Sequence, residues 1–247
     1  MLALGGVAQA GGEASAVALG LLMFAAGMPH GAADDDGTTI RRFGLPHAAA
    51  YVVAAGAVAA FMLAAPLTGL TLFFLLSAWH FAHSGQGPAP RRWGIAMIAV
   101  AGSALWRPDE TAAVLQTILG EPVPPWWLAT LAAAGALGVV LALPALRTRP
   151  ADATLWSALA AVLLFHPVLA AGMVFLVAHA VPVQQRQIER YGVAAVCAAV
   201  SPTTLAAVLG ALALATLVAT GMLALPVATA LAFGMATPHM LGDRLAG

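Results

Sequence analysis

The chain has 247 residues, of which 62% are hydrophobic and 8% charged, and a soluble domain of this length could not bury so much apolar surface. Ten basic and ten acidic residues leave no net charge, so no basic field attracts nucleic acid and no nucleic-acid partner is expected. The single cysteine, Cys197, excludes an intramolecular disulfide and a cysteine-based metal cluster.

Long apolar runs, separated by proline, glycine and charged residues, predict helices that span a membrane. A spanning helix needs about 20 apolar residues, and its backbone polar groups must be satisfied within the segment. The expected fold is all-α, a polytopic transmembrane helical bundle of eight or nine helices in a single integral membrane domain over residues 1–247. In chain order, the predicted helices lie at about 14–29, 45–65, 68–84, 93–106, 125–146, 152–165, 168–182, 202–225 and 226–242.

The remaining polarity is predicted to mark the membrane surface. The segments around 109–120 and 184–199 carry most of it and are interpreted as interfacial. The first apolar run lacks the preceding Lys and Arg residues of a secretory signal, so it is interpreted as a retained helix.

Arginines in the loops after the first, third and fifth predicted helices indicate the orientation. These are Arg41 and Arg42, Arg91 and Arg92, and Arg147 and Arg149. By the positive-inside tendency these loops are cytoplasmic and the N-terminus lies outside, although Arg107 falls on the opposite side. The expected location is the inner, cytoplasmic membrane of a bacterium or archaeon.

Four histidines lie at or just past the C-terminal ends of long apolar runs: His30, His80, His179 and His239. These helix ends share the predicted cytoplasmic side, provided that Pro167 separates two antiparallel segments. Helix C-termini carry partial negative charge, which favours a bound cation, and neutral imidazole suits Fe(II), Zn or Cu. A shared metal site is therefore predicted. His47 and His166 lie beside prolines and are predicted to be interfacial or structural.

Two further residues extend the predicted metal site. His83 forms an H-x-x-H pair with His80, and residues three apart on a helix share a face, so the two could chelate one ion. The alternative is that His83 only reaches the interface. Asp34, four residues after His30, could accept the second ring N–H of that ligand.

The helix faces around the predicted site are apolar. Steps of three, four or seven residues back from the histidines reach Met23, Phe73, Leu76, Gly172, Phe175 and Met235. These residues are predicted to line an apolar, partly aromatic passage, and ordinary helix packing is the alternative. A long nonpolar substrate that enters from lipid needs such a wall.

Histidines lie in several short motifs along the chain, among them GMPHGAAD at 27–34 and SAWHF at 77–81. The first resembles the G-x-PHGA-x-D motif of the Brp/Blh membrane β-carotene 15,15′-dioxygenases, and the second resembles the S-x-x-HF motif of the same family. TPHM at 237–240 resembles the late PHM motif, and FLVAHAVPV at 175–183 is similar to the third ligand region. The order and spacing of the motifs fit across essentially the whole chain.

The resemblance implies an iron-dependent, all-helical membrane enzyme that uses O₂ to cleave β-carotene at its central double bond into two retinals. It also implies that His30, His80 and His179 are ligands of Fe(II). The family has a further histidine four residues after the third ligand, where this chain has Val183. His83 or His239 would then complete the ligand set, which leaves an open position for O₂.

Other functions remain alternatives at this stage. A membrane di-iron desaturase or hydroxylase needs clusters with adjacent histidines, and the seven histidines include no adjacent pair. A transporter or proton relay needs acids within the spans, and almost none are there. The remaining alternatives are a related membrane metalloprotein that acts on another apolar lipid or polyene, and a non-catalytic retinoid-binding protein.

Overall fold

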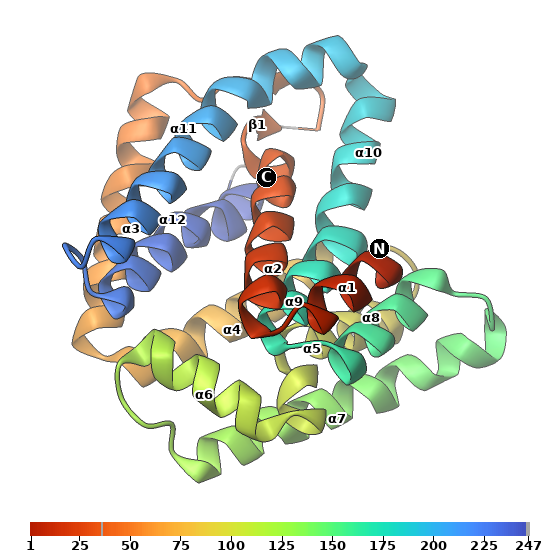
Figure 1. Cartoon of the computed structure of the whole chain (residues 1–247). Helices are drawn as coiled ribbons and strands as arrows, with labels where there is room; N and C mark the ends of the chain where they lie inside the picture. Colours follow the sequence, from red (N-terminus) through yellow and green to blue (C-terminus); the bar gives the residue numbers. More distant parts are fainter. Residues whose placement is uncertain (36, 246–247) are drawn as a thin grey trace. The chain divides into compact units, whose positions relative to one another are not determined.

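The structure is a computed structural model that describes residues 1–35 and 37–245, with the side chains of Asp34 and of residues 241–245 outside the described part. It is predominantly helical, so the predicted all-α class is confirmed (Figure 1). Contacts group the chain into two compact units. Unit 1 comprises Met1–Gly27, Ser77–Gln116 and Glu121–Pro182, and unit 2 comprises Met28–Leu76, Thr117–Gly120 and Val183–Gly247. The single membrane domain over 1–247 stays a prediction.

Unit 1 is built around helices that pack through small residues. It contains α1 (Leu2–Ala10), α2 (Glu13–Gly27), the end of α4 (Pro66–Ser84), α5 (Ala89–Trp106), most of α6 (Pro108–Leu119), α7 (Pro125–Thr148), α8 (Ala153–Leu164), α9 (Pro167–Val174) and the π-helical turn η2 (Phe175–Ala180). Helix α5 lies along α7 (Figure 1). A side-chain carbon at Gly94 would lie 2.8 Å from the carbonyl oxygen of Gly138, so the two backbones touch.

Unit 2 is held mainly by α3 (Leu45–Ala64) packed against α12 (Leu225–Leu245). Its other elements are the 3-10 turn η1 (Met28–Gly31), strands β1 (Asp34–Asp35) and β2 (Ile40–Arg41), the start of α4, α10 (Val181–Tyr191) and α11 (Val193–Ala219). The two strands form one short antiparallel pair. The Tyr51 hydroxyl of α3 donates a hydrogen bond of 2.6 Å to the Met235 carbonyl of α12.

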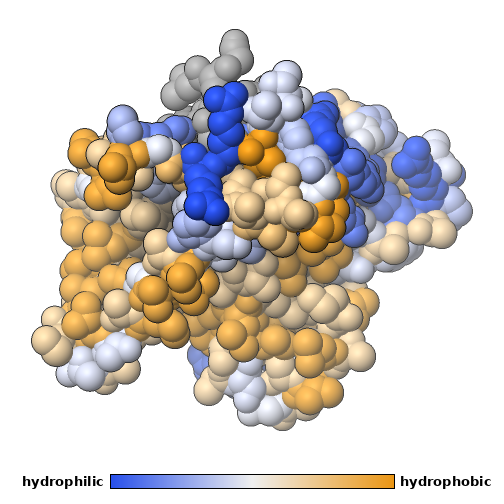
Figure 2. All heavy atoms as spheres, turned by 90° about the horizontal axis from the view of Figure 1, so that it is seen from above, coloured by the Kyte–Doolittle hydropathy of each residue, from blue (hydrophilic) through white to orange (hydrophobic). Residues whose placement is uncertain are grey.

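The helices are those of a membrane protein. Among the residues that the structure describes, five segments are long and apolar enough to cross a bilayer: Glu13–Gly31, Leu45–Ala64, Pro125–Thr148, Pro167–Tyr191 and Val193–Ala219. Large apolar side chains stand on the surface, among them Leu45 at 87% exposure, and hydrophobic residues cover much of the face in Figure 2. Such exposure is typical of surfaces that contact a membrane or another protein.

The predicted count of eight or nine helices is wrong, because the described residues form helices α1 to α12. Hydropathy alone missed the more polar helices. The segment interpreted as interfacial around 109–120 is α6, whose start at Pro108 with Asp109 and Glu110 in the first turn is favourable for a helix N-terminus. The amphipathic stretch at 184–199 lies in α10 and the start of α11.

Pro202 does not begin a helix, contrary to the prediction, but lies inside α11. Proline has no backbone N–H, so the carbonyl four residues earlier, that of Ala198, loses its helical partner. The Arg42 Nε donates a hydrogen bond of 2.8 Å to this oxygen. The side chain therefore replaces the missing backbone donor, and the helix continues.

The predicted break at Pro167 is confirmed. Helix α8 ends at Leu164, Phe165 is extended, and α9 begins at Pro167 and packs against α8. The His166 Nδ1 accepts a hydrogen bond of 3.4 Å from the Val168 N–H, so this histidine caps α9, in agreement with its predicted structural role.

Asp152 connects two helices of unit 1 through a nearly buried ion pair. Its carboxylate accepts hydrogen bonds of 2.5 and 2.9 Å from the Arg91 guanidinium and caps α8 through the Leu155 N–H at 3.1 Å. The hydrogen bond from Arg91 lowers the pKa of Asp152 below its ordinary value of 3.8.

Replacing Asp152 by alanine is expected to lower the free energy of unfolding by about 2 kcal/mol at neutral pH, because α8 loses its cap and Arg91 loses its charged partner. Asp152→Asn keeps a capping oxygen and should lose less. Because the folded-state pKa of Asp152 is lowered, its contribution is present above pH 3.8 and is lost as the pH falls through the folded-state pKa. Thermal unfolding in detergent at neutral and acid pH measures both effects, and equal melting temperatures for all three proteins at neutral pH would contradict them.

Candidate metal centre

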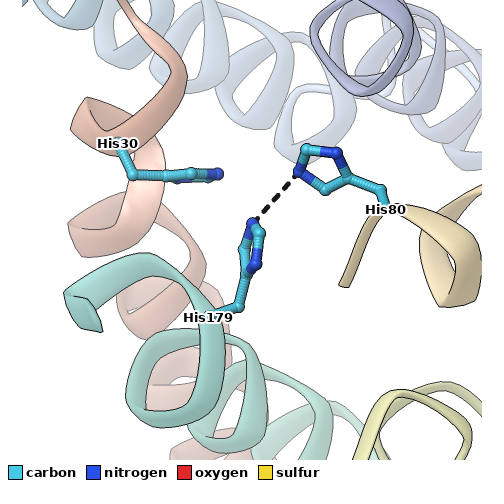
Figure 3. Close-up of side chains that lie close together, drawn as sticks. All are labelled: His30, His80 and His179. Carbon is cyan, nitrogen blue, oxygen red and sulfur yellow. Dashed lines mark hydrogen bonds between the residues drawn. The ribbon is translucent and has the colours of Figure 1, made fainter. Parts of the chain in front are cut away.

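Unit 1 brings together two of the predicted ligands, His80 on α4 and His179 on η2. Their Nε2 atoms are 3.2 Å apart, and the dashed line in Figure 3 joins the two rings. Both residues are buried, with exposed fractions of 5% and 4%. The planes of the rings cross at 67°, so the nitrogen atoms, not the ring faces, approach one another.

His179 lies in a π-helical turn, and Pro182 gives a local reason for that turn. Proline cannot donate to the carbonyl four residues earlier, and its ring crowds that carbonyl in a regular α-helix. Here the backbone N–H of Val181 bonds to the carbonyl of Leu176, five residues back, as in a π-helix. The wider turn changes the direction in which the side chain of His179 points away from the helix axis. Turns of this kind are frequent at functional sites.

Unit 2 brings together the other two predicted ligands, His30 on η1 and His239 on α12. Their Nε2 atoms are also 3.2 Å apart, and the planes of the rings cross at 83°. His30 is 8% exposed, and His239 is partly buried. A residue 209 positions later in the chain thus becomes the partner of the first motif's histidine.

Asp35, the neighbour of the predicted Asp34, anchors the segment that carries His30. The Asp35 carboxylate accepts hydrogen bonds from the Tyr191 hydroxyl at 2.6 Å and from the Gln187 side chain at 3.2 Å. The Gln187 amide also donates to the His30 carbonyl at 3.4 Å. The spacing of Gln187 and Tyr191 on one face of an amphipathic helix was the available signal. The side chain of Asp34 lies outside the described part of the structure.

His83 has a different environment from His80. Its side chain is exposed, and its Nδ1 lies 2.8 Å from the Trp79 carbonyl oxygen. Its ring contacts the rings of Trp79 and Trp93, with centroids 4.9 and 5.8 Å away. Tryptophan is typical of membrane interfaces, so these contacts favour the interfacial interpretation of His83.

The predicted substrate-lining residues of unit 1 have separate environments. Met23 is buried in the apolar core, and Gly172 lies against the backbone of Gly20, where a side-chain carbon would meet the carbonyl oxygen. Phe175 is partly buried and lies beside His179, with ring centroids 5.8 Å apart. A cavity in unit 1 that reaches His179 is lined by other residues, including Phe81, Val174 and Arg92.

The three predicted lining residues of unit 2 differ in exposure. Phe73 stacks on Phe233 with ring centroids 4.3 Å apart, and Leu76 is half-buried. The side chain of Met235 is 44% exposed. A substrate passage along these residues and those of unit 1 stays a prediction.

The histidine pairs fit the requirements of a transition-metal ion. Two nitrogens 3.2 Å apart match neighbouring ligands of one ion, because imidazole bonds of about 2.1 Å then enclose an angle of about 100°. Imidazole binds as a neutral ring, so burial does not oppose it as it opposes a carboxylate. His80 and His179, both buried in unit 1, could therefore serve as two ligands of one metal ion.

Comparison with known families gives a match over most of the chain. The sequence profile described as beta-carotene 15,15′-dioxygenase matches residues 21–242. The chain belongs to the β-carotene 15,15′-dioxygenase family. The resemblance predicted from the motifs is confirmed. Comparisons with curated proteins and with solved structures find no significant match.

Membership of the β-carotene 15,15′-dioxygenase family supports a carotenoid dioxygenase function in broad terms. The matched range contains all four paired histidines. It also contains Val183, at the position where the resemblance leads one to expect a histidine. The structure pairs His30 with His239, which makes His239 a candidate for the ligand that Val183 cannot supply.

Gly31 lets the ring of His239 approach the η1 turn. A side-chain carbon at Gly31 would overlap the His239 ring, with three ring atoms in closer than van der Waals contact. We expect Gly31→Ala to displace His239 and to weaken metal binding by at least about tenfold, although every histidine is retained. Metal content per chain, measured on folded protein, tests this expectation.

The matched control is Gly56→Ala in α3, because a side-chain carbon at that position would have no neighbour within 4 Å beyond the adjoining residues of its own helix. This variant should keep the metal content of the wild type. Equal metal content in the two variants would show that the contact between Gly31 and His239 has no role in metal binding.

Proposed function

We propose that the chain is a non-haem iron oxygenase that uses O₂ to cleave β-carotene at the central 15,15′ double bond into two retinals. The proposed ligands of Fe(II) are His30, His80, His179 and His239. The observation that carries the proposal is the presence of two histidine pairs, each with Nε2 atoms 3.2 Å apart, in a chain of the β-carotene 15,15′-dioxygenase family.

Neutral imidazole ligands suit Fe(II) in apolar surroundings. They bind the ion without placing carboxylate charge at low dielectric, where an ionised group is costly. When bound, Fe(II) supplies the oxygen chemistry, and no protein nucleophile is required. The residues of the chain then hold the ligands in place and exclude water. Phe81, whose ring centroid is 4.5 Å from that of His179, and Phe175 supply apolar cover on one side of the ligand.

His239 is the proposed fourth ligand in place of the histidine that Val183 replaces. Its Nε2 already lies beside the Nε2 of His30, whereas His83 is exposed and contacts tryptophans. Asp35 and Gln187 support this arrangement because they hold the turn from which His30 projects.

The proposed substrate enters from the bilayer. β-Carotene is a nonpolar polyene, and the apolar surface of the helices gives it direct access from lipid. The proposed lining residues remain Met23, Phe73, Leu76, Gly172, Phe175 and Met235. We further propose that the N-terminus lies outside the cytoplasmic membrane, because the arginine-rich loops then face the cytoplasm.

Expression in a host that produces β-carotene tests the reaction. The wild type is expected to remove the orange pigment and to form retinal, whereas His80→Ala should leave the pigment unchanged because it removes an iron ligand. His47→Ala is the matched control, since His47 is exposed and contacts Phe43. Retinal formation by His80→Ala at the wild-type rate would refute the proposed site. Unchanged pigment with iron-loaded wild type would redirect the proposal to another polyene.

Iron content distinguishes His239 from His83 as the fourth ligand. Wild type and His83→Ala are expected to retain about one iron per chain, and His239→Ala to lose most of it. Elemental analysis of the purified proteins gives this ratio, and circular dichroism checks that the variants are folded. The reverse result would make His83 the ligand, and two irons per chain would support di-iron chemistry.

A further inference from the structure

Ser84 contacts both paired histidines of unit 1, His80 at its backbone carbonyl and His179 at its ring nitrogen Nδ1. It lies one helical turn after His80 on α4, so the two residues share a face. Its Oγ is 2.8 Å from the His80 carbonyl oxygen and 2.9 Å from Nδ1 of His179. The second distance joins Ser84 to the ring nitrogen that does not face His80.

The hydroxyl of Ser84 can donate only one hydrogen. A serine inside a helix commonly donates it to the carbonyl four residues earlier, and the His80 carbonyl is that acceptor at 2.8 Å. Toward His179 the Ser84 oxygen must then act as an acceptor. The hydrogen of this contact therefore belongs to Nδ1 of His179.

A neutral imidazole with its proton on Nδ1 has an unprotonated Nε2. In His179 this Nε2 is the atom that lies 3.2 Å from Nε2 of His80, on the side of the proposed metal. The other tautomer would carry its proton on Nε2 and block coordination there. A hydrogen bond to the second nitrogen is the usual means by which proteins orient a ligand histidine.

We infer that Ser84 is a positioning residue that holds His179 in the Nδ1–H tautomer and thereby raises the affinity of the site for its metal. The inference rests on the proposed function, because it takes His179 to be a ligand through Nε2. Ser84 itself does not touch the metal in this arrangement. Neither the family match nor the sequence motifs assign this role to Ser84.

Metal affinity in matched variants tests the inference without any turnover. Threonine and valine side chains have nearly the same shape, but only threonine keeps the hydroxyl, so Ser84→Thr and Ser84→Val form a matched pair. Co(II) titration of the apoprotein in detergent is expected to show binding roughly 10–100-fold weaker for Ser84→Val and for Ser84→Ala than for the wild type. Ser84→Thr should stay within a few-fold of the wild type.

The tautomer can be observed directly in the unaltered chain. Long-range ¹H–¹⁵N correlation spectra of the metal-free wild type distinguish protonated from unprotonated ring nitrogens. His179 should show a protonated Nδ1 and an unprotonated Nε2, with the assignment made by comparison with His179→Gln. A proton on Nε2 of His179 would overturn the inference, whatever the variants do.

The outcomes separate this inference from the proposed function. If the wild type binds neither Co(II) nor iron, the proposed metal site fails. If the wild type binds Co(II) and Ser84→Val binds it as tightly as Ser84→Thr, the site stands and the role of Ser84 is refuted. Thermal unfolding of each variant confirms that the comparison is made between folded proteins, and Ser84→Ala serves as the comparison if the larger side chains do not fit.

Discussion

A polar ring buried among apolar side chains needs a partner for each of its nitrogens, and this constraint shapes the candidate metal centre. In unit 1, His179 meets it with His80 at Nε2 and with Ser84 at Nδ1. In unit 2, the Nε2 atoms of His30 and His239 meet each other. Two unprotonated nitrogens at 3.2 Å repel one another unless a hydrogen or a cation lies between them. A bound metal ion would therefore give these nitrogens a partner, as the hydrogen bonds between the rings do when no metal is bound.

Prolines create a similar need for hydrogen-bond partners in the backbone. A proline inside a helix leaves one carbonyl without its helical donor, and lipid supplies no replacement donor. The chain resolves this in different ways. Beside Pro202 the Arg42 side chain supplies the donor, and α11 continues. Before Pro182 the helix widens into a π turn, and that turn carries His179. Pro167 instead begins a new helix, where the missing N–H costs nothing. Prolines thus account for the widened turn before Pro182 and for the helix start at Pro167.

Val183 stands where the family resemblance leads one to expect a histidine, so the proposed ligand set draws on a residue from another part of the chain. The expected histidine would stand one helical turn after His179, whereas the partner found for His30 comes from α12, near the end of the chain. The close approach of His239 requires a glycine at position 31, which is part of the first motif. Gly31 of the first motif and His239 of the last motif therefore contact one another. This contact joins the GMPHGAAD and TPHM segments of the chain.

The sequence by itself determined the all-α class, the break at Pro167 and the family, because hydropathy, proline and short motifs are local properties of the chain. It also singled out the four histidines that the structure places in two pairs. It did not determine the polar helices α6 and α10, since apolar length is a poor guide to amphipathic segments. Only the tertiary structure decided that His239 meets His30, that Asp35 anchors the turn, and that Ser84 contacts His179. These contacts join residues about 100 to 200 positions apart, and such pairings depend on how the helices pack, which no local pattern records.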